Sequence, residues 1–326
     1  MSNMDIAETR RPQDGRILFK SELGRLDLRI STYPTLYGEK AVLRLLNLAE
    51  ALFSLNDLGF EENIAKKFNN MLIGSEGIIL VSGPTGSGKT TTLYSTLNRL
   101  EKPDVNIVTV EDPIEYDLAN INQAQVNIKS GVTFSSALRS ILRQDPDIIM
   151  VGEVRDEETV ELAIRASLTG HLVFSTIHTN DAASGFTRLL NWNIEPFLIT
   201  STVKGILAQR LVRRLCKECS EPYSPDSQEL KMAGLSEYEN LQAYKSAGCL
   251  NCRNTGYKGR IGIYELLIMD NDVAELILKG VPAYKMREQA RENGMITLLE
   301  DGVSKIKRGD TSISEIYETL GTTQIV

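Results

Sequence analysis

The sequence has no apolar run long enough to cross a lipid bilayer. Apolar stretches such as Ile148 to Val151 and Leu266 to Met269 fall far short of the roughly 20 residues that a spanning helix needs. The first residues, Met1 to Glu8, are acidic and lack the apolar core of a secretory signal. We therefore predict a cytoplasmic protein that reaches a membrane only through a partner.

The sequence also lacks internal repeats, low-complexity segments and an excess of basic residues. Of its 326 residues, 42% are hydrophobic and 24% are charged, as in ordinary globular proteins of two or three domains. The formal net charge of −7 disfavours a surface that wraps nucleic acid, so we expect no direct nucleic-acid partner.

Cysteine is scarce, and its four occurrences are paired. They form two C-x-x-C pairs separated by 29 residues. Zinc takes four thiolates in a tetrahedron, and this spacing leaves no cysteine over. Disulfides would need an oxidising compartment, and a redox C-x-x-C would not occur in duplicate. The pattern predicts a closed, structural Zn²⁺ site formed by Cys216, Cys219, Cys249 and Cys252.

The most informative stretch of the sequence runs from Gly77 to Thr92. A short apolar run leads into G-x-x-x-x-G-K-[ST], and a helix-prone segment follows, which is the context of a P-loop rather than of a chance glycine-rich turn. Glycines let main-chain N–H groups converge on phosphate oxygens. Lys89 is expected to neutralise the β- and γ-phosphates of ATP, and Thr90 to bind Mg²⁺. The predicted nucleotide-binding residues are Gly83, Pro84, Thr85, Gly86, Ser87, Gly88, Lys89, Thr90 and Thr91.

Short apolar runs alternate with helical stretches after the P-loop. This alternation predicts an α/β fold whose parallel sheet is covered on both faces. A preceding helix is predicted over 61–73, with Ile64, Phe68, Met71 and Leu72 on one face. The predicted strands are 78–82, 105–110, 147–152 and 172–177, and the predicted helices between them include 134–143 and 157–167.

The two ends of the chain have simpler patterns. Residues 1 to about 50 alternate apolar and polar side chains and predict two or three strands, too few to bury a core alone. The carboxyl-terminal part reads as helical: Pro282 opens one helix, Gly294 closes it, and Ser312 with Glu315 is typical of a capping box.

Three carboxylates follow the predicted strand 105–110. Because ligands sit at the carboxyl ends of parallel strands, we predict that Glu115 positions or deprotonates the water that attacks ATP. Glu111 or Asp112 are alternatives for this base, or orient metal-bound water. The stretch Asp147 to Glu153 has the form of a Walker B strand. The usual aspartate is replaced by Gly152, so Glu153 is assigned to Mg²⁺, through water, with a share in the base role left open.

Two histidines flank the predicted strand 172–177. His178, at its carboxyl end, is placed to sense the γ-phosphate, whereas a structural role is as plausible for His171. Arg29 and Arg44, outside the nucleotide-binding segment, are arginine-finger candidates. Arg143 and Arg155 are the alternatives.

Together these residues resemble one family. The stretches are, in order, Gly83 to Thr90, Glu111 to Glu115, Leu142 to Asp156, the histidine segment through His178, and the cysteine pairs followed by Gly259 to Glu265. Their order and their residues are similar to those of the secretion ATPases of bacterial type II secretion and type IV pilus assembly. Thr109 to Tyr116, Gln123 to Asn127 and Ile194 to Phe197 look more like the type II branch (GspE) than the pilus-extension branch (PilB). The cysteine pairs argue against the pilus-retraction branch.

The resemblance implies a RecA-like P-loop ATPase that converts ATP and water to ADP and phosphate within a homo-hexameric ring. It implies a partial amino-terminal, β-rich, PAS-like domain (1–50) that supplies Arg29 and Arg44, a RecA-like core (51–212), a zinc-binding four-cysteine subdomain (213–264) and a helical subdomain (265–326). The ring would sit on inner-membrane platform proteins and drive the addition of pilin-like subunits.

Family members carry a longer amino-terminal region, so the resemblance implies a truncated form, a fragment or a shortened homologue. Two alternatives from other classes remain open. One is a nucleic-acid translocase, which the acidity and the lack of an aromatic and basic stacking groove disfavour. The other is a non-catalytic scaffold that only binds ATP.

Overall fold

The computed structural model describes residues 4–21, 24–47 and 53–321. The chain forms two compact units, Met1–Phe53 and Ser54–Val326. In the described ranges, no helix combines the length and the apolar character needed to cross a membrane.

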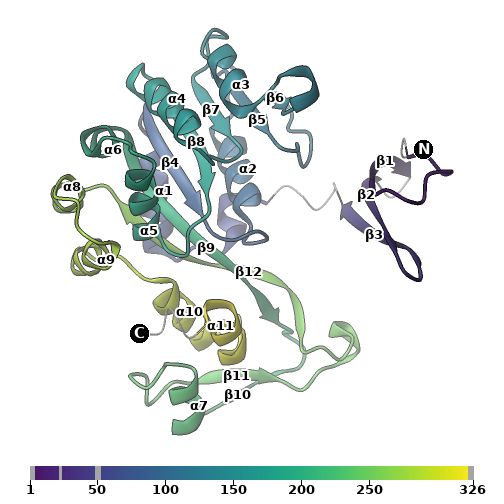
Figure 1. Ribbon diagram of the computed structural model, residues 1–326. Helices are drawn as coiled ribbons and strands as arrows, with labels where there is room; N and C mark the ends of the chain where they lie inside the picture. The colour runs from purple at the N-terminus through teal and green to yellow at the C-terminus, as the bar shows by residue number, and fades with distance from the viewer. Residues whose placement is uncertain (1–3, 22–23, 48–52, 322–326) are drawn as a thin grey trace. The chain divides into compact units, whose positions relative to one another are not determined.

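The smaller unit is a three-stranded antiparallel sheet of order β1-β2-β3 (Figure 1). Its strands are β1 (Gln13–Ser21), β2 (Gly24–Thr35) and β3 (Gly38–Asn47). The prediction of two or three strands is confirmed. Leu43 and Leu45 on β3 are 58% and 64% exposed, so this sheet leaves apolar side chains uncovered within its own unit.

The larger unit is built on a seven-stranded sheet of order β12-β9-β4-β8-β7-β5-β6. Neighbouring strands from β9 to β6 are parallel, and β12 runs antiparallel to β9. The four strands and the parallel pairing predicted from the sequence are confirmed. The strands are β4 (Gly77–Ser82), β5 (Ile107–Glu111), β6 (Asn122–Gln125), β7 (Ile148–Val151), β8 (Leu172–Ile177), β9 (Val203–Leu215) and β12 (Tyr257–Ile268).

Helices cover both faces of this sheet (Figure 1). Alternate residues of β4 supply the two faces: Ile79 and Val81 pack with α1 and α2, whereas Ile78 and Leu80 pack with α3 to α6. The four apolar residues predicted on one face of the first helix are all buried. The helices are α1 (Glu62–Leu72), α2 (Lys89–Leu100), α3 (Phe134–Ile141), α4 (Glu157–Leu168), α5 (Ala182–Asn191) and α6 (Pro196–Thr202).

The strands β9 and β12 extend beyond the core as a two-stranded ribbon (Figure 1). Beyond the end of β9, the chain forms β10 (Ser220–Tyr223), α7 (Ser227–Met232) and β11 (Ala243–Ser246), and it returns through β12. Four helices follow, which are α8 (Asn271–Leu278), α9 (Ala283–Glu292), α10 (Leu298–Lys307) and α11 (Ile313–Leu320). Short 3₁₀ segments are η2 (Leu55–Leu58), η3 (Ile128–Ser130) and η4 (Leu250–Cys252).

The predicted capping box at Ser312 is only half formed. The Ser312 hydroxyl accepts a hydrogen bond from the Glu315 N–H at 3.3 Å. The Glu315 carboxylate does not return to Ser312, because it binds the Arg213 main-chain N–H (2.8 Å) and guanidinium on β9. A complete box forms instead at Thr297 and Glu300, where α10 begins.

Candidate functional site

The loop between β4 and α2 makes a tight turn that depends on three glycines with positive φ. Gly83, Gly86 and Gly88 have φ values of 148°, 82° and 90°. A Cβ at Gly83 would lie 2.5 Å from Ser87 Oγ and 2.6 Å from the Gln209 main-chain oxygen, so this position needs glycine. The amino end of α2 follows directly, and its unpaired N–H groups favour an anion.

Lys89 begins α2 and folds back over the loop. Its Nζ donates to the main-chain oxygens of Gly83 (2.8 Å) and Pro84 (3.0 Å). Burial lowers the pKa of Lys89, the Glu153 carboxylate raises it, and the positive charge of Arg210 lowers it further. Lys89 therefore lies within electrostatic range of one carboxylate and one further cation.

Glu111, at the end of β5, is a buried anchor. It is 3% exposed and accepts hydrogen bonds from the Tyr94 hydroxyl, from Thr109 Oγ1 (2.7 Å) and from Gln123 Nε2 (3.0 Å). Tyr94 belongs to α2, so these bonds fix the acidic segment to the helix that follows the P-loop. Burial raises the pKa of Tyr94, and Glu111 adds to the effect, so the phenol stays protonated.

Glu115 lies in the loop that follows this anchor. Its main-chain N–H donates to the Tyr94 hydroxyl at 3.3 Å, and its side chain is half-buried. Asp112, the other acidic candidate in the segment, is exposed. The assignment of the base to Glu115 stays a prediction, and the engagement of Glu111 by three donors leaves it less available for that role.

Glu153 lies beyond the end of β7, and its side chain is 14% exposed. Its carboxylate pairs with Arg155, and His178 Nε2 lies 3.5 Å from Glu153 Oε2. The Thr176 hydroxyl donates to the Gly152 main-chain oxygen at 2.8 Å, which joins the ends of β7 and β8. The structure thus brings Glu153, Arg155 and His178 together at the carboxyl edge of the sheet, where α/β proteins bind ligands.

Two other candidates are engaged elsewhere. His171 lies at the amino end of β8, and its Nδ1 is 2.8 Å from the Ala166 main-chain oxygen. Arg143 donates to the Arg139 main-chain oxygen (2.7 Å) and to Ser140 Oγ (3.3 Å), both on α3. These contacts support a structural role for His171.

The two arginine-finger candidates are neighbours on the sheet of the smaller unit. Arg29 on β2 lies opposite Arg44 on β3, and Arg16 on β1 lies opposite Arg29. Directly paired residues project from the same face of an antiparallel sheet, so the three guanidinium groups form one row. Arg16 was not predicted from the sequence. Arg16 could be found only from its position opposite Arg29, and that position is known once the register of the two strands is known.

The residues at the P-loop edge fit a magnesium nucleotide. Mg²⁺ takes hard oxygen ligands. Thr90, in the first turn of α2, offers a half-buried hydroxyl, and Glu153 offers a carboxylate near Lys89. The glycine conformations and the buried Ser87 hydroxyl, which has no hydrogen-bond partner among the described atoms, are consistent with a loop shaped for a polyphosphate. These metal and nucleotide assignments stay predictions.

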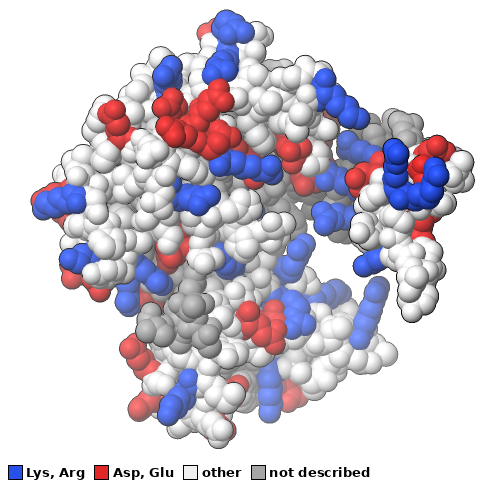
Figure 2. Space-filling view, in the orientation of Figure 1, with Lys and Arg blue, Asp and Glu red and all other residues white. Residues whose placement is uncertain are grey.

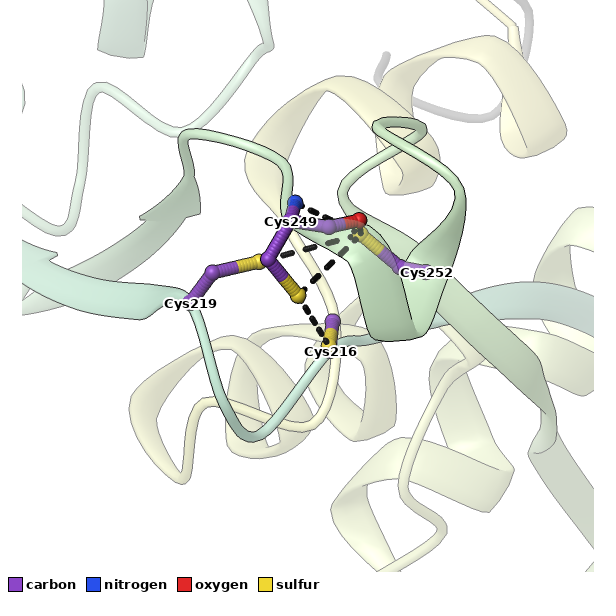
Figure 3. Close-up of side chains that lie close together, drawn as sticks. All are labelled: Cys216, Cys219, Cys249 and Cys252. Atoms are coloured by element: carbon purple, nitrogen blue, oxygen red, sulfur yellow. Dashed lines mark hydrogen bonds between the residues drawn. The ribbon is translucent and has the colours of Figure 1, made fainter.

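The four cysteines converge between the end of β9 and η4 (Figure 3). All four Sγ atoms lie within 4.8 Å of one another. The pairs Cys216–Cys249, Cys219–Cys252 and Cys249–Cys252 are each 3.8 Å apart. A tetrahedral zinc ion with Zn–S bonds of about 2.3 Å places its sulfurs about 3.8 Å apart. The cluster is therefore compatible with zinc.

The surroundings of the cluster favour thiolates. Cys252 Sγ accepts hydrogen bonds from the N–H groups of Cys249 (3.1 Å) and Gly256 (3.3 Å). Burial raises the pKa of Cys252, but these donors outweigh burial and lower it to about 6. Ser246 Oγ lies 2.9 Å from Cys219 Sγ. Such donors commonly support metal ligands.

Two buried polar residues of β9 and β12 were also not predicted from the sequence. Gln209 donates to the Ser87 main-chain oxygen and accepts from Thr92 Oγ1, each at 2.8 Å. Glu265 is fully buried. A glutamine and a glutamate inside apolar strands were the available signal, but only the fold shows what they contact.

Basic and acidic side chains are interspersed over the face of the larger unit seen in Figure 2. Acidic side chains gather over α4, which carries Glu157, Glu158 and Glu161.

The fold and the loop between β4 and α2 are those of a P-loop α/β protein. The chain belongs to the family described as "Type II/IV secretion system protein", whose model matches residues 1–318. The family predicted from the sequence motifs is thereby confirmed.

Relatives come from both branches of the family. The chain is 49% identical over 318 residues to the type IV pilus assembly ATPase PilB of Thermus thermophilus, covering 97% of this chain and 36% of that protein. It is 47% identical over 316 residues to the type II secretion system ATPase E of Vibrio cholerae, covering 97% and 63%. It is 48% identical over 316 residues to the type II secretion system protein HxcR of Pseudomonas aeruginosa, covering 97% and 64%. The chain thus spans about one third to two thirds of these relatives.

Solved structures share the fold. The pilus retraction motor PilT with bound ADP matches with a TM-score of 0.69 and 27% identity, over 96% of this chain and 78% of that one. The Legionella pneumophila ATPase DotB matches with a TM-score of 0.69 and 23% identity, over 94% and 77%.

Proposed function

We propose that this chain is the ATP-hydrolysing motor of a type II secretion system, which powers assembly of a pilin-like filament. The observation that carries the proposal is the grouping of Lys89, Glu153 and His178 at one edge of the sheet, in a chain whose family includes named ATPases. The interspersed charges of Figure 2 and the net charge of −7 favour it over a nucleic-acid translocase.

In the proposed reaction, water attacks the γ-phosphorus of ATP while Glu115 accepts the proton of that water. The bond to the β,γ-bridging oxygen breaks, and ADP and phosphate leave. Lys89 exchanges its bonds to Gly83 and Pro84 for the phosphates. Mg²⁺, held by Thr90 and, through water, by Glu153, would neutralise phosphate charge. Arg29 and Arg44 would supply positive charge to the departing phosphate.

We further propose that the chain acts as a homo-hexamer at the cytoplasmic face of the inner membrane, on platform proteins. The resemblance to motors of this family supports this arrangement, and the row formed by Arg16, Arg29 and Arg44 is a source of positive charge for a departing phosphate.

The test is steady-state ATP hydrolysis against protein concentration, with mass read by light scattering on the same samples. We expect the rate per chain to rise with concentration as a hexamer forms. Arg29→Ala is expected to lower the saturating rate by about 10³-fold, as for an arginine finger, with ATP binding intact. Lys89→Ala is expected to weaken binding itself. A monomer that binds ATP but hydrolyses it at a near-zero rate at every protein concentration would contradict the proposal.

Pilus extension is the second candidate, since the Thermus thermophilus PilB is 49% identical to this chain. Deleting the gene in its host separates the two. Loss of secreted enzymes with surface pili retained supports type II secretion, and loss of pili with secretion retained supports extension.

A further inference from the structure

Strand β9 passes directly beside the P-loop, and two adjacent residues on it face opposite ways. Successive side chains of a strand alternate between faces. Gln209, which is 1% exposed, points toward α2 and bonds Ser87 and Thr92. Arg210, which is 6% exposed, serves the other face. One short stretch of β9 therefore touches structure on both sides of the sheet.

Arg210 connects strand β9, beside the P-loop, to the loop that follows His178. Its Nη1 donates to the Gln209 main-chain oxygen at 3.0 Å. This is the oxygen that a Cβ at Gly83 would approach to 2.6 Å. Its Nη2 donates to the Asn180 main-chain oxygen at 2.7 Å. A single guanidinium thus bridges the strand beside Gly83 and the loop two residues after His178.

Glu265 holds the same loop from the next strand. It lies on β12 opposite Ala208, so it shares a face with Arg210. One of its carboxylate oxygens accepts a hydrogen bond from the Ala182 N–H at 2.9 Å. The segment from His178 to Ala182 is therefore fixed at Asn180 by Arg210 and at Ala182 by Glu265, and it begins with the histidine that lies 3.5 Å from Glu153.

Packing alone does not account for a cation at this position. Burial lowers the pKa of Arg210, and the nearby Asp181 and Glu265 carboxylates raise it. Burying a charge costs free energy that an apolar side chain would avoid. Arg210 also contributes to the lowered pKa of Lys89, so its charge reaches the lysine of the P-loop.

The geometry points to Arg210 as a positioning residue that couples the P-loop to His178 and Glu153. When phosphate binding displaces the loop at Gly83, the displacement reaches Asn180 through the β9 main chain and the Arg210 guanidinium. His178 then moves relative to Glu153. This inference rests on the proposed ATPase function and deepens it.

The test compares Arg210→Gln and Arg210→Lys with a matched control, Arg188→Gln. Arg188 is an exposed residue of α5 that lies over Trp192, 4.8 Å from the ring centroid. Three quantities are measured: kcat, the Kd of a non-hydrolysable ATP analogue, and the rate at which diethyl pyrocarbonate modifies each histidine, read by peptide mass spectrometry. The chain has only two histidines, so His171 serves as the internal reference.

For Arg210→Gln we expect kcat to fall by about 10- to 100-fold, the effect of a displaced group, with the analogue Kd within about twofold of the parent. In the parent chain, the analogue changes the modification rate of His178. In the variant that response is lost, while His171 is unchanged. Arg210→Lys keeps the charge but reaches only one of the two carbonyls, so we expect an intermediate loss. Arg188→Gln leaves all values unchanged.

The outcomes separate the two proposals. A parent chain that does not hydrolyse ATP contradicts the proposed function, while the His178 response still tests the coupling. An Arg210→Gln variant with normal kcat and a normal His178 response overturns the coupling. Loss of analogue binding as severe as in Lys89→Ala also overturns it, because Arg210 would then be a direct phosphate ligand. If Arg210→Gln fails to fold by circular dichroism, Arg210→Lys decides by the same readouts.

Discussion

The cysteine cluster and the P-loop edge differ in how far the folded chain completes them. In the cluster, four Sγ atoms already stand at the spacing of a zinc tetrahedron, with N–H donors in place around Cys252. At the P-loop edge, Lys89 is bound to two main-chain oxygens and Glu153 to Arg155. A closed structural site needs one geometry, whereas the proposed ATPase site must exchange these partners at each cycle.

The largest effect is expected when one ligand of the cysteine cluster is removed. Cys216→Ser removes one of the four thiolates, and structural zinc contributes about 10–16 kcal/mol in small zinc domains. We expect the zinc content to fall from about one ion per chain to near zero and the region around β10 and β11 to unfold locally. Metal analysis and limited proteolysis measure both.

Ser246→Ala is the matched control for this change. It removes the contact to Cys219 Sγ but leaves four thiolates, so zinc is expected to remain bound. Unchanged zinc in Cys216→Ser would refute the four-cysteine site.

The next largest effect is expected at the P-loop edge. Glu115→Gln is expected to slow ATP hydrolysis by about 10²- to 10⁴-fold, as for loss of a general base, with nucleotide binding largely intact. Single-turnover kinetics with a separate binding titration measure the two quantities. Asp112→Asn is the control, because Asp112 is an exposed carboxylate of the same segment. A larger loss in Asp112→Asn, or equal loss of binding and rate in Glu115→Gln, would contradict the assignment.

The smallest expected effect concerns Glu265, which is buried and accepts a hydrogen bond from the segment that follows His178. Burial raises the pKa of Glu265 above its ordinary value of 4.5, so the folded chain keeps this proton at pH values where the unfolded chain has lost it. The folded state binds more protons in that window. The Glu265 contribution to stability therefore rises as the pH falls from neutral through the raised pKa toward 4.5.

Glu265→Gln is neutral throughout and is expected to remove this part of the pH dependence. We expect the Tm of Glu265→Gln to exceed that of the parent by about 2–4 °C near neutral pH. This difference is expected to shrink on acidification. Thermal unfolding from pH 7 to pH 5 measures it. A Tm difference that grows with acid would reverse the sign and contradict the argument.

Patterns local in the sequence predicted the structure well. The strands 78–82 and 172–177, the face of α1 and the convergence of the cysteines all depend on residues close in sequence or on chemistry with one solution. The helix-opening role of Pro282 is of the same kind, since it lies at the N-cap of α9.

Contacts between distant residues were beyond prediction. Glu315 was expected to cap its own helix, but Arg213, 102 residues away, binds it. The bond from Tyr94 to Glu111 spans two elements, and the row that adds Arg16 depends on strand register. The strands β9 and β12 carry Gln209, Arg210 and Glu265 in buried positions, so their pattern did not show the alternation of a half-buried strand.

The ribbon of β9 and β12 gives the molecule a mechanical property. The same unbroken strand passes Gln209 at the P-loop and ends at Leu215, next to Cys216. The six residue steps from Gln209 to Leu215 span about 20 Å of extended strand, so a tilt of about 5° at the P-loop end displaces the cysteine end by about 2 Å. The zinc-compatible cluster thus lies at the far end of a two-stranded arm, where a small rotation of β9 beside the P-loop becomes a larger displacement.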